Sequence, residues 1–272
     1  MMFRARFAVS MGIISAICLG IGAAKAETVD VYAAGSLRGV VTALAPKALA
    51  MGIELKPTFG GAGDLRDRIE QGATPDLLLS ADMASPRRLV AEGRAGEPAI
   101  AFARNRLCLV ARRSLGLTPA NLVARLLGKN VRIKTSKPVA DPSGDYAMAM
   151  FDLIEAARPG AGKSLRANAE AQMAVTVPGV RPGQNATAAL FEAKRVDVAV
   201  TYCSASADLL KDTHDLVRIA VPASFDPKPV FGMALLSTNP AAMRFALLLL
   251  SDVGQDAISA SGLIPLADDP HR

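Results

Sequence analysis

The stretch Val29-Asp-Val-Tyr-Ala-Ala-Gly-Ser36-Leu37 decides the fold of this chain. It predicts a short strand, then small residues, then a serine where a helix should begin. A helix N-terminus carries unpaired N–H groups and about half a positive charge. A strand that ends at such a helix start therefore indicates a place where an anion could bind.

The chain repeats this arrangement of a loop that leads into a helix start. The other examples are Thr58–Gly63, Asp141–Gly144 and Pro182–Asn185. Several helix starts aimed at one point would hold an anion without a lysine or an arginine. The ordinary alternative is that Ser36, Ser143 and Asn185 are helix caps, because serine and asparagine are preferred at that position.

Apolar runs of strand length alternate with runs of helical period along most of the chain. This alternation predicts an α/β fold with mixed, mostly parallel sheets flanked by helices, whose ligands bind at the carboxyl ends of strands. The segment 240–261 predicts one long final helix, and Gly160-Ala-Gly162 predicts a loop.

Two segments have the character of crossings between two lobes. The first is a nearly continuous strand over 100–110 with a polar break at Arg104-Asn-Arg106, and the second is Phe225–Phe231. We therefore expect a ligand cleft between two lobes, one of them discontinuous. The expected boundaries are 27–104 plus 225–272 for lobe 1 and 105–224 for lobe 2.

The N-terminus has the pattern of a secretory signal peptide. Arg4 and Arg6 precede an uncharged run over 7–24, and the small-x-small sequence Ala24-Lys-Ala26 follows. The pattern predicts a leader over 1–26, cleaved near Ala26, and a mature chain in the periplasm. A membrane anchor is the alternative, although the run is only marginally long enough to span a bilayer and contains glycines.

Charge gives little reason to expect a nucleic-acid partner. The formal charge of +6 falls by three, to +3, when Arg4, Arg6 and Lys25 leave with the leader. Basic and acidic residues are interspersed in the remainder, and aromatic residues make up 4% of the chain. These features do not describe a basic nucleic-acid-binding surface.

Two cysteines remain in the mature chain, Cys108 and Cys203. An oxidising compartment favours a disulfide between them, and two buried free thiols are the alternative. A cation site is not expected, because there is no Cys-x-x-Cys and the only histidines are His214 and His271. Catalysis is not expected either, since no Gly-x-Ser-x-Gly elbow is present.

Several motifs of this chain resemble one known family, the molybdate-binding proteins of bacterial ABC importers. The motifs are Val31–Leu37, Leu65–Ala73, Pro75–Asp82, Pro142–Ala147 and Val198–Tyr202. The resemblance covers nearly all of 27–266. It implies a two-lobed (type II) periplasmic binding protein that holds a tetrahedral dianion between its lobes with neutral donors.

In lobe 1, the resemblance assigns the first ligand-binding serine to Ser36. The second serine of the family falls on Ala62, which has no hydroxyl, so only its backbone N–H could donate. Gly61 and Gly63 flank it as neighbours of the site. This departure puts strict molybdate specificity in question.

In lobe 2, the resemblance assigns a backbone donor to Ser143 and a hydroxyl donor to Tyr202. Gln184 falls on the next backbone donor, with Asn185 as the alternative if the loop shifts by one residue. Asp64 and Asp145 lie near these positions, and two alternatives are open for them: to face the cleft or to point away from it. A carboxylate there would repel a dianion.

We therefore expect a periplasmic solute-binding protein that captures molybdate or tungstate by hinge closure, uses no cofactor and is not an enzyme. Its expected partner is an inner-membrane ABC permease, and it is expected to act as a monomer. The alternatives are sulfate, or a small organic anion held by Arg104 or Arg106. A secreted sensory or interaction protein is another alternative, and a secreted hydrolase ranks behind it.

Overall fold

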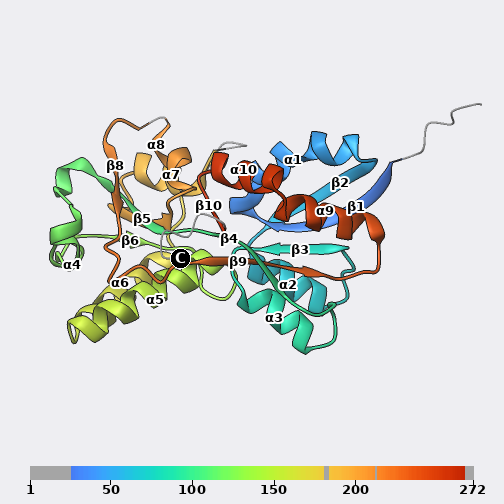
Figure 1. Ribbon diagram of the computed structural model, residues 1–272. Helices are drawn as coiled ribbons and strands as arrows, with labels where there is room; N and C mark the ends of the chain where they lie inside the picture. Colours follow the sequence, from blue (N-terminus) through green and yellow to red (C-terminus); the bar gives the residue numbers. More distant parts are fainter. Residues whose placement is uncertain (1–25, 181–183, 212, 267–272) are drawn as a thin grey trace, which may run out of the picture.

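The computed structural model describes residues 26–180, 184–211 and 213–266, which form two lobes side by side (Figure 1). Lobe 1 is built on a six-stranded sheet and lobe 2 on a four-stranded sheet. The predicted leader lies, apart from Ala26, outside the described residues. So do Pro182 and Gly183 of one predicted helix start and the last six residues assigned to lobe 1.

The lobe 1 sheet contains the predicted strand that begins at Val29 and ends just before Gly35 and Ser36. Its strands, in spatial order, are β10 (Ile264–Pro265), β4 (Ile100–Arg104), β9 (Val230–Leu235), β3 (Leu77–Ser80), β1 (Glu27–Ala34) and β2 (Ile53–Gly60). Strand β1 is parallel to both of its neighbours, whereas β9 is antiparallel to β3 and β4.

The lobe 2 sheet has the order β6 (Ile133–Lys134), β7 (Val198–Tyr202), β5 (Leu107–Arg112) and β8 (Leu216–Ala220). Strands β6 and β7 are parallel, and β5 is antiparallel to both β7 and β8. The β5–β7 register places Leu107 opposite Tyr202. Consequently, the adjacent positions Cys108 and Cys203 come together, and the structure joins them in a disulfide with Cα atoms 4.8 Å apart.

Both sheets are mixed as expected, but the expectation that they are mostly parallel is wrong. Among the paired strands of the described residues, three pairs are parallel and five are antiparallel. A parallel pair needs a long crossover, usually a helix. Strands β5 and β9 instead enter their sheets directly from the other lobe, and they run against the strands beside them.

Helices cover both sheets. In lobe 1 they are α1 (Arg38–Ala50), α2 (Ala62–Glu70), α3 (Ala84–Ala91), α9 (Pro240–Leu250) and α10 (Asp252–Ala260), with a 3-10 turn at Gly35–Leu37. In lobe 2 they are α4 (Leu122–Leu126), α5 (Pro142–Ala157), α6 (Ala161–Met173), α7 (Ala186–Glu192) and α8 (Ser206–Leu210), with 3-10 turns at Arg113–Leu115 and Pro119–Asn121.

The chain passes between the two sheets at two places that lie next to each other. Only Asn105 and Arg106 separate β4 from β5, and residues 221–229 connect β8 to β9. The Asn105 N–H donates to the Pro229 carbonyl at 2.9 Å, and its side-chain amide donates to Ser204 Oγ at 2.8 Å. The polar break in the first crossing is thus a buried, hydrogen-bonded asparagine.

Acidic residues at the two ends of β3 hold the lobe 1 framework. Before the strand, Asp76 accepts the Asp30 N–H at 2.9 Å and the Ser237 hydroxyl at 2.6 Å. After it, Asp82 accepts the Ser85 N–H in the first turn of α3 at 2.8 Å. These bonds fix Ala81, whose carbonyl lies at the cleft.

Two helix boundaries differ from expectation. The predicted final helix breaks at Ser251, which has extended backbone angles and separates α9 from α10. The predicted loop at Gly160-Ala-Gly162 is instead the start of α6. No helix within the described ranges is long and apolar enough to cross a membrane.

Candidate functional site

A cavity of about 900 Å³ lies between the two lobes. Lobe 1 contributes the segments after β1, β2 and β3, and lobe 2 contributes the segments before α5 and α7 and after β7. The cavity wall includes Ser36, Arg38, Gly61, Ala62, Ala81, Ser136, Asp141, Ser143, Asn185, Thr201, Tyr202 and Asp208.

Four helical segments of the described chain begin at this cavity. Their first residues are Gly35, Ala62, Pro142 and Ala186, two from each lobe. The first N–H groups of a helix have no intrahelical acceptor, and the helix dipole adds partial positive charge there. These helix starts therefore direct partial positive charge of the backbone toward the cavity.

Ser36 does not act as an ordinary helix cap. The capping position of its 3-10 turn is Ala34, and no side chain caps that turn. The Ser36 hydroxyl is buried and has no hydrogen-bond partner among the described residues. Leaving a buried hydroxyl unpaired costs about 1–3 kcal/mol, so this side chain is not explained by the stability of the fold.

The Gly61–Gly63 segment starts α2 and sits against lobe 2. Gly61 and Ala62 line the cavity, and Ala62 is fully buried. Gly63 does not line it, because the Val139 carbonyl of lobe 2 covers its α-carbon. The predicted ligand-binding position Ala62 and its neighbour Gly61 therefore lie in the cavity wall, whereas the other neighbour, Gly63, makes an interlobe contact.

Ser143 lines the cavity, but its backbone N–H already has an acceptor. Asp141 caps α5, and its Oδ1 accepts that N–H at 2.9 Å. Asp141 itself also lines the cavity. Sequence reasoning missed this carboxylate, although a residue with a side-chain oxygen before Pro142 is a recognisable cap.

Between the two alternatives in the α7 loop, the structure places Asn185 at the cavity. Asn185 caps α7, and its Oδ1 accepts the Thr187 N–H at 2.9 Å and the Ala188 N–H at 3.3 Å. Gln184 is absent from the cavity lining, and its side-chain amide donates to Glu192 at 3.0 Å.

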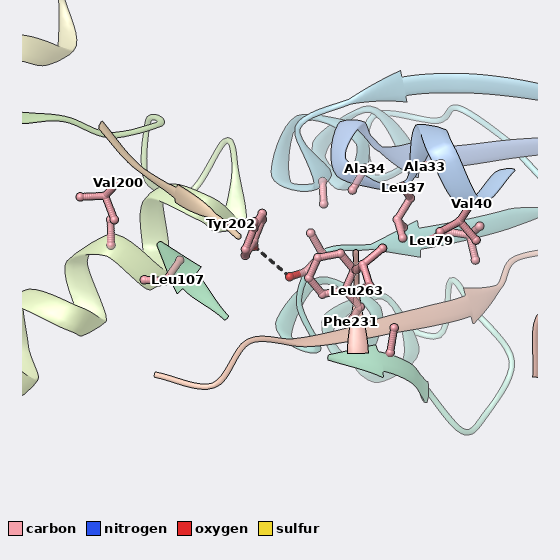
Figure 2. Packing of buried hydrophobic residues seen from close by; sticks show 14 of the residues in the cluster. Ala33, Ala34, Leu37, Val40, Leu79, Leu107, Val200, Tyr202, Phe231 and Leu263 are labelled. Carbon is pink, nitrogen blue, oxygen red and sulfur yellow. Dashed lines mark hydrogen bonds between the residues drawn. The ribbon is translucent and has the colours of Figure 1, made fainter. Parts of the chain in front are cut away.

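Tyr202 bridges the lobes at the floor of the cavity. Figure 2 shows its ring between lobe 2 residues such as Val200 and lobe 1 residues such as Ala34. Its hydroxyl donates to the Ala81 carbonyl at 3.2 Å, and the residue is 3% exposed. Burial, and to a smaller extent the nearby Asp141 carboxylate, raise the pKa of Tyr202 well above its usual value. The hydroxyl therefore keeps its proton and remains a donor.

The charged residues considered at the outset are not in the cavity wall. Asp64, Asp145, Arg104 and Arg106 are all absent from the lining. Asp145 instead accepts the Val139 N–H at 2.9 Å, and partial burial raises the pKa of its carboxyl group.

Different charged residues line the cavity in their place, namely Arg38 of lobe 1 and Asp208 of lobe 2, together with Asp141. The Arg38 guanidinium lies 4.1 Å from the centre of the Phe59 ring. Stacking on an aromatic ring restrains an arginine while leaving its N–H groups available. Sequence reasoning missed Arg38. The available signal for this site residue was its position two residues after Ser36, at the start of a helix.

A second cavity of about 560 Å³ continues from the first into lobe 2. The two share Ser136, Asn185, Thr201 and Ala205 in their walls. The Thr135 hydroxyl borders this second cavity, is buried, and has no partner in the described parts of the chain. Those parts contain no cluster of three or more residues that could hold a metal cation.

Two lobes with a cleft between them, lined by helix starts from both, define a two-lobed solute-binding protein. The chain belongs to the bacterial extracellular solute-binding protein family, whose model matches residues 29–264. It is thus a solute-binding protein of the ABC-transporter type, and its family functions in binding outside the cytoplasm rather than in catalysis.

The chain is similar to one curated sequence and to solved structures that share its fold and are named for different anions. Uncharacterized protein PM1146 of Pasteurella multocida strain Pm70 is 32% identical over 243 residues, which cover 86% of this chain and 98% of that protein. The sulfate-binding protein SubI of Mycobacterium tuberculosis H37Rv superposes with a TM-score of 0.73 at 16% identity, covering 89% of this chain and 88% of SubI. The periplasmic molybdate-binding protein of Azotobacter vinelandii does so with a TM-score of 0.67 at 20% identity, covering 87% and 98%.

Proposed function

We propose that this protein captures a tetrahedral oxyanion, molybdate or tungstate, between its lobes and delivers it to a membrane permease. The observation that carries the proposal is the buried Ser36 hydroxyl, which has no partner among the described residues, at a cavity where four helical segments begin. An anion in this cavity would provide the acceptor that the hydroxyl lacks. Likeness to a molybdate-binding protein supports the choice of anion.

Neutral donors can provide the required affinity. Each hydrogen bond to a charged group contributes about 1.5–3 kcal/mol, so five or more can offset the lost hydration of a small dianion. The donors we assign are the Ser36 hydroxyl, the first-turn N–H groups at Ala62 and Ser143, and those near Asn185.

The Asp141 carboxylate in the cavity wall is compatible with anion binding, because nearby groups compensate part of its charge. Asp141 accepts the Ser143 N–H, and α5 starts directly after it, so part of its charge is compensated by the helix dipole. Arg38 adds a positive charge on the opposite lobe. Binding would require the Ser143 N–H to turn from Asp141 to the ligand, or the ligand to use other donors in lobe 2.

A small organic anion is the second candidate, because the space is large. A water molecule occupies about 30 Å³ in the liquid, and a five-atom dianion needs only a few times that volume. The cleft of about 900 Å³ exceeds this need several times over, and it opens into the second cavity. Arg38 could hold the carboxylate or phosphate of a larger ligand. Sulfate is the third anion to test, given the likeness to SubI.

Calorimetric titration with molybdate, tungstate, sulfate and glycerol 3-phosphate tests these alternatives. Tight binding of molybdate and tungstate supports the proposal. Tight binding of glycerol 3-phosphate alone favours the organic anion. Absence of heat with every anion, in protein shown to be folded by circular dichroism, would reject the anion-binding function while leaving the family assignment intact.

Tyr202→Phe is expected to weaken anion binding by about 0.5–1.5 kcal/mol, the net value of one hydrogen bond. The Tyr202 hydroxyl donates to the Ala81 carbonyl of the other lobe, so the substitution removes a hydrogen bond only in the state in which the lobes are in contact. Calorimetry gives Kd, and thermal unfolding of the unliganded protein should show little change. A large fall in Tm with an unaltered Kd would assign the hydroxyl to folding alone.

Ala62→Ser is expected to tighten molybdate binding by about 0.5–1.5 kcal/mol, because it adds one hydroxyl donor at the start of α2. The variant returns the serine that the resembling family carries at this position. Titration of both proteins against molybdate and sulfate measures the change. Equal affinities would show that residue 62 does not contact the anion.

The proposal also includes secretion of the protein and its docking on a permease. Cleavage near Ala26 would release it into the periplasm, where the monomer with closed lobes would dock on an inner-membrane permease. Mass spectrometry of the protein from periplasmic extracts would define the mature N-terminus, and size-exclusion chromatography with light scattering would define its oligomeric state.

A further inference from the structure

The Gly61–Gly63 segment lies against backbone carbonyl groups of the other lobe. A Cβ added at Gly61 would lie 2.3 Å from the Ala140 carbonyl oxygen, and one at Gly63 would lie 1.7 Å from the Val139 carbonyl oxygen. The Asp64 N–H donates to the Ala140 carbonyl at 3.2 Å. Two carbonyl groups of lobe 2 thus lie directly on the first turn of α2 in lobe 1.

The lobe 2 loop that carries these carbonyls is held in an unusual conformation. Val139 has a φ of +71°, in the left-handed region that a β-branched residue rarely adopts. Its N–H donates to Asp145 Oδ1 at 2.9 Å, and Asp145 lies in the first turn of α5. Such a conformation persists only where surrounding groups hold it, and this carboxylate is the group bonded to the strained residue.

Gly144 allows the same loop to lie close against α5. A Cβ at that position would be 2.5 Å from the Ser136 carbonyl oxygen and 2.7 Å from the Pro138 nitrogen. The Asp141 N–H also donates back to the Lys137 carbonyl at 3.0 Å. The loop is therefore built as a fixed projection from lobe 2, with Val139 and Ala140 at its tip.

We infer that Gly61, Gly63 and Asp145 are positioning residues for lobe closure, through a clasp formed by the Val139 and Ala140 carbonyls on the first turn of α2. The N–H groups and dipole of α2 attract these carbonyls, and the missing side chains at Gly61 and Gly63 let them approach. This inference requires that the protein is a two-lobed binding protein, but it does not depend on which anion binds. It assigns the glycine-rich segment to closure in addition to ligand contact.

Hydrogen exchange at the Asp64 amide reports the clasp directly. Asp64 is the third residue of α2, so its N–H has no acceptor within the helix, and its described acceptor is Ala140 of the other lobe. Protection of this amide therefore measures lobe contact, whether or not the added anion is the physiological ligand. Small-angle X-ray scattering gives the accompanying radius of gyration.

The first variants are Gly63→Ala and the control Gly96→Ala. Gly63→Ala should abolish protection of the Asp64 amide, increase the radius of gyration and weaken molybdate binding by roughly tenfold or more, because a methyl group overlaps the Val139 carbonyl only when the lobes meet. Gly96 has no atom nearer than 3.9 Å to an added Cβ, so Gly96→Ala should behave as the wild type. Wild-type protection and radius in Gly63→Ala would overturn the inference.

The second set tests Asp145 with a rescue. Asp145→Ala should lose Asp64 protection, whereas Asp145→Asn, which keeps an oxygen acceptor for Val139, should retain it. Val139→Gly placed on Asp145→Ala should restore protection, because glycine adopts positive φ without strain. Asp152→Ala, on the same helix but paired with Arg166, is the matched control.

These outcomes separate the clasp from the anion-binding proposal. If wild-type protein binds none of the tested anions, exchange and scattering still report the clasp. Absence of Asp64 protection in the wild type, with and without molybdate, would overturn the clasp. So would failure of Val139→Gly to rescue Asp145→Ala.

Discussion

Replacing both Cys108 and Cys203 by alanine is expected to lower the unfolding free energy by about 2–5 kcal/mol. The disulfide closes a loop with a sequence separation of 95 residues, and long loops lose the most entropy when they are cross-linked in the unfolded chain. Chemical denaturation of the variant and of wild-type protein, with and without reductant, measures the difference. Reduced wild-type protein should fall close to the variant.

The position of the disulfide adds a functional component to this prediction. Cys203 follows Tyr202 directly, and Cys108 follows its register partner Leu107. The bond therefore ties together the two strands that hold the interlobe tyrosine. Protein from the periplasm, denatured without reductant, should contain no titratable thiol. Two free thiols, or equal stability of variant and wild type, would contradict the prediction.

Local signals in the sequence were sufficient to locate most of the helix starts. Ser36, the Gly60–Gly63 segment, Asp141 and Asn185 are each at or beside the first residue of a helical segment. Caps and turns depend on a few neighbouring residues, so a single sequence contains most of the information. The crossing at Asn105 was visible for the same reason, as a polar break in an apolar run.

The prediction of a loop from glycine was wrong where the glycine instead allows two helices to pack closely. Gly162 lies in α6, where a Cβ would be 2.1 Å from the Phe151 carbonyl oxygen of α5. The missing side chain therefore allows the two helices to pack closely. A glycine signals a loop or a close contact equally well, and only the neighbouring segment decides between them.

The composition of the site was only partly predictable. Thr201 and Asp208 lie in the cavity wall because of how helices and strands pack, and no short motif marks them. Gln184 and Asn185 differ by one position, and the cap at Asn185 determines which of them faces the cavity. The resemblance supplied Ser36 and Tyr202, but the partner of Tyr202 in the other lobe required the folded chain.

Ser36→Ala is expected to change stability and binding in opposite directions. The hydroxyl is buried and has no partner in the described part of the chain, so its removal should leave the unliganded protein as stable as the wild type or more stable. The same change should weaken molybdate binding by about 1.5–3 kcal/mol, roughly 10- to 150-fold in Kd, because a hydrogen bond to a charged ligand is lost. Thermal unfolding without ligand and calorimetry with molybdate measure the two effects.

Thr135→Val is the matched comparison, because Thr135 is the other buried hydroxyl at these cavities without a partner among the described residues. It borders only the second cavity, so Thr135→Val should raise or preserve stability while leaving the Kd for molybdate unchanged. A ligand that extends into lobe 2 would instead be weakened by both substitutions. If Ser36→Ala lowers stability and leaves Kd unaltered, the hydroxyl serves the fold, and the observation that carries the oxyanion proposal is lost.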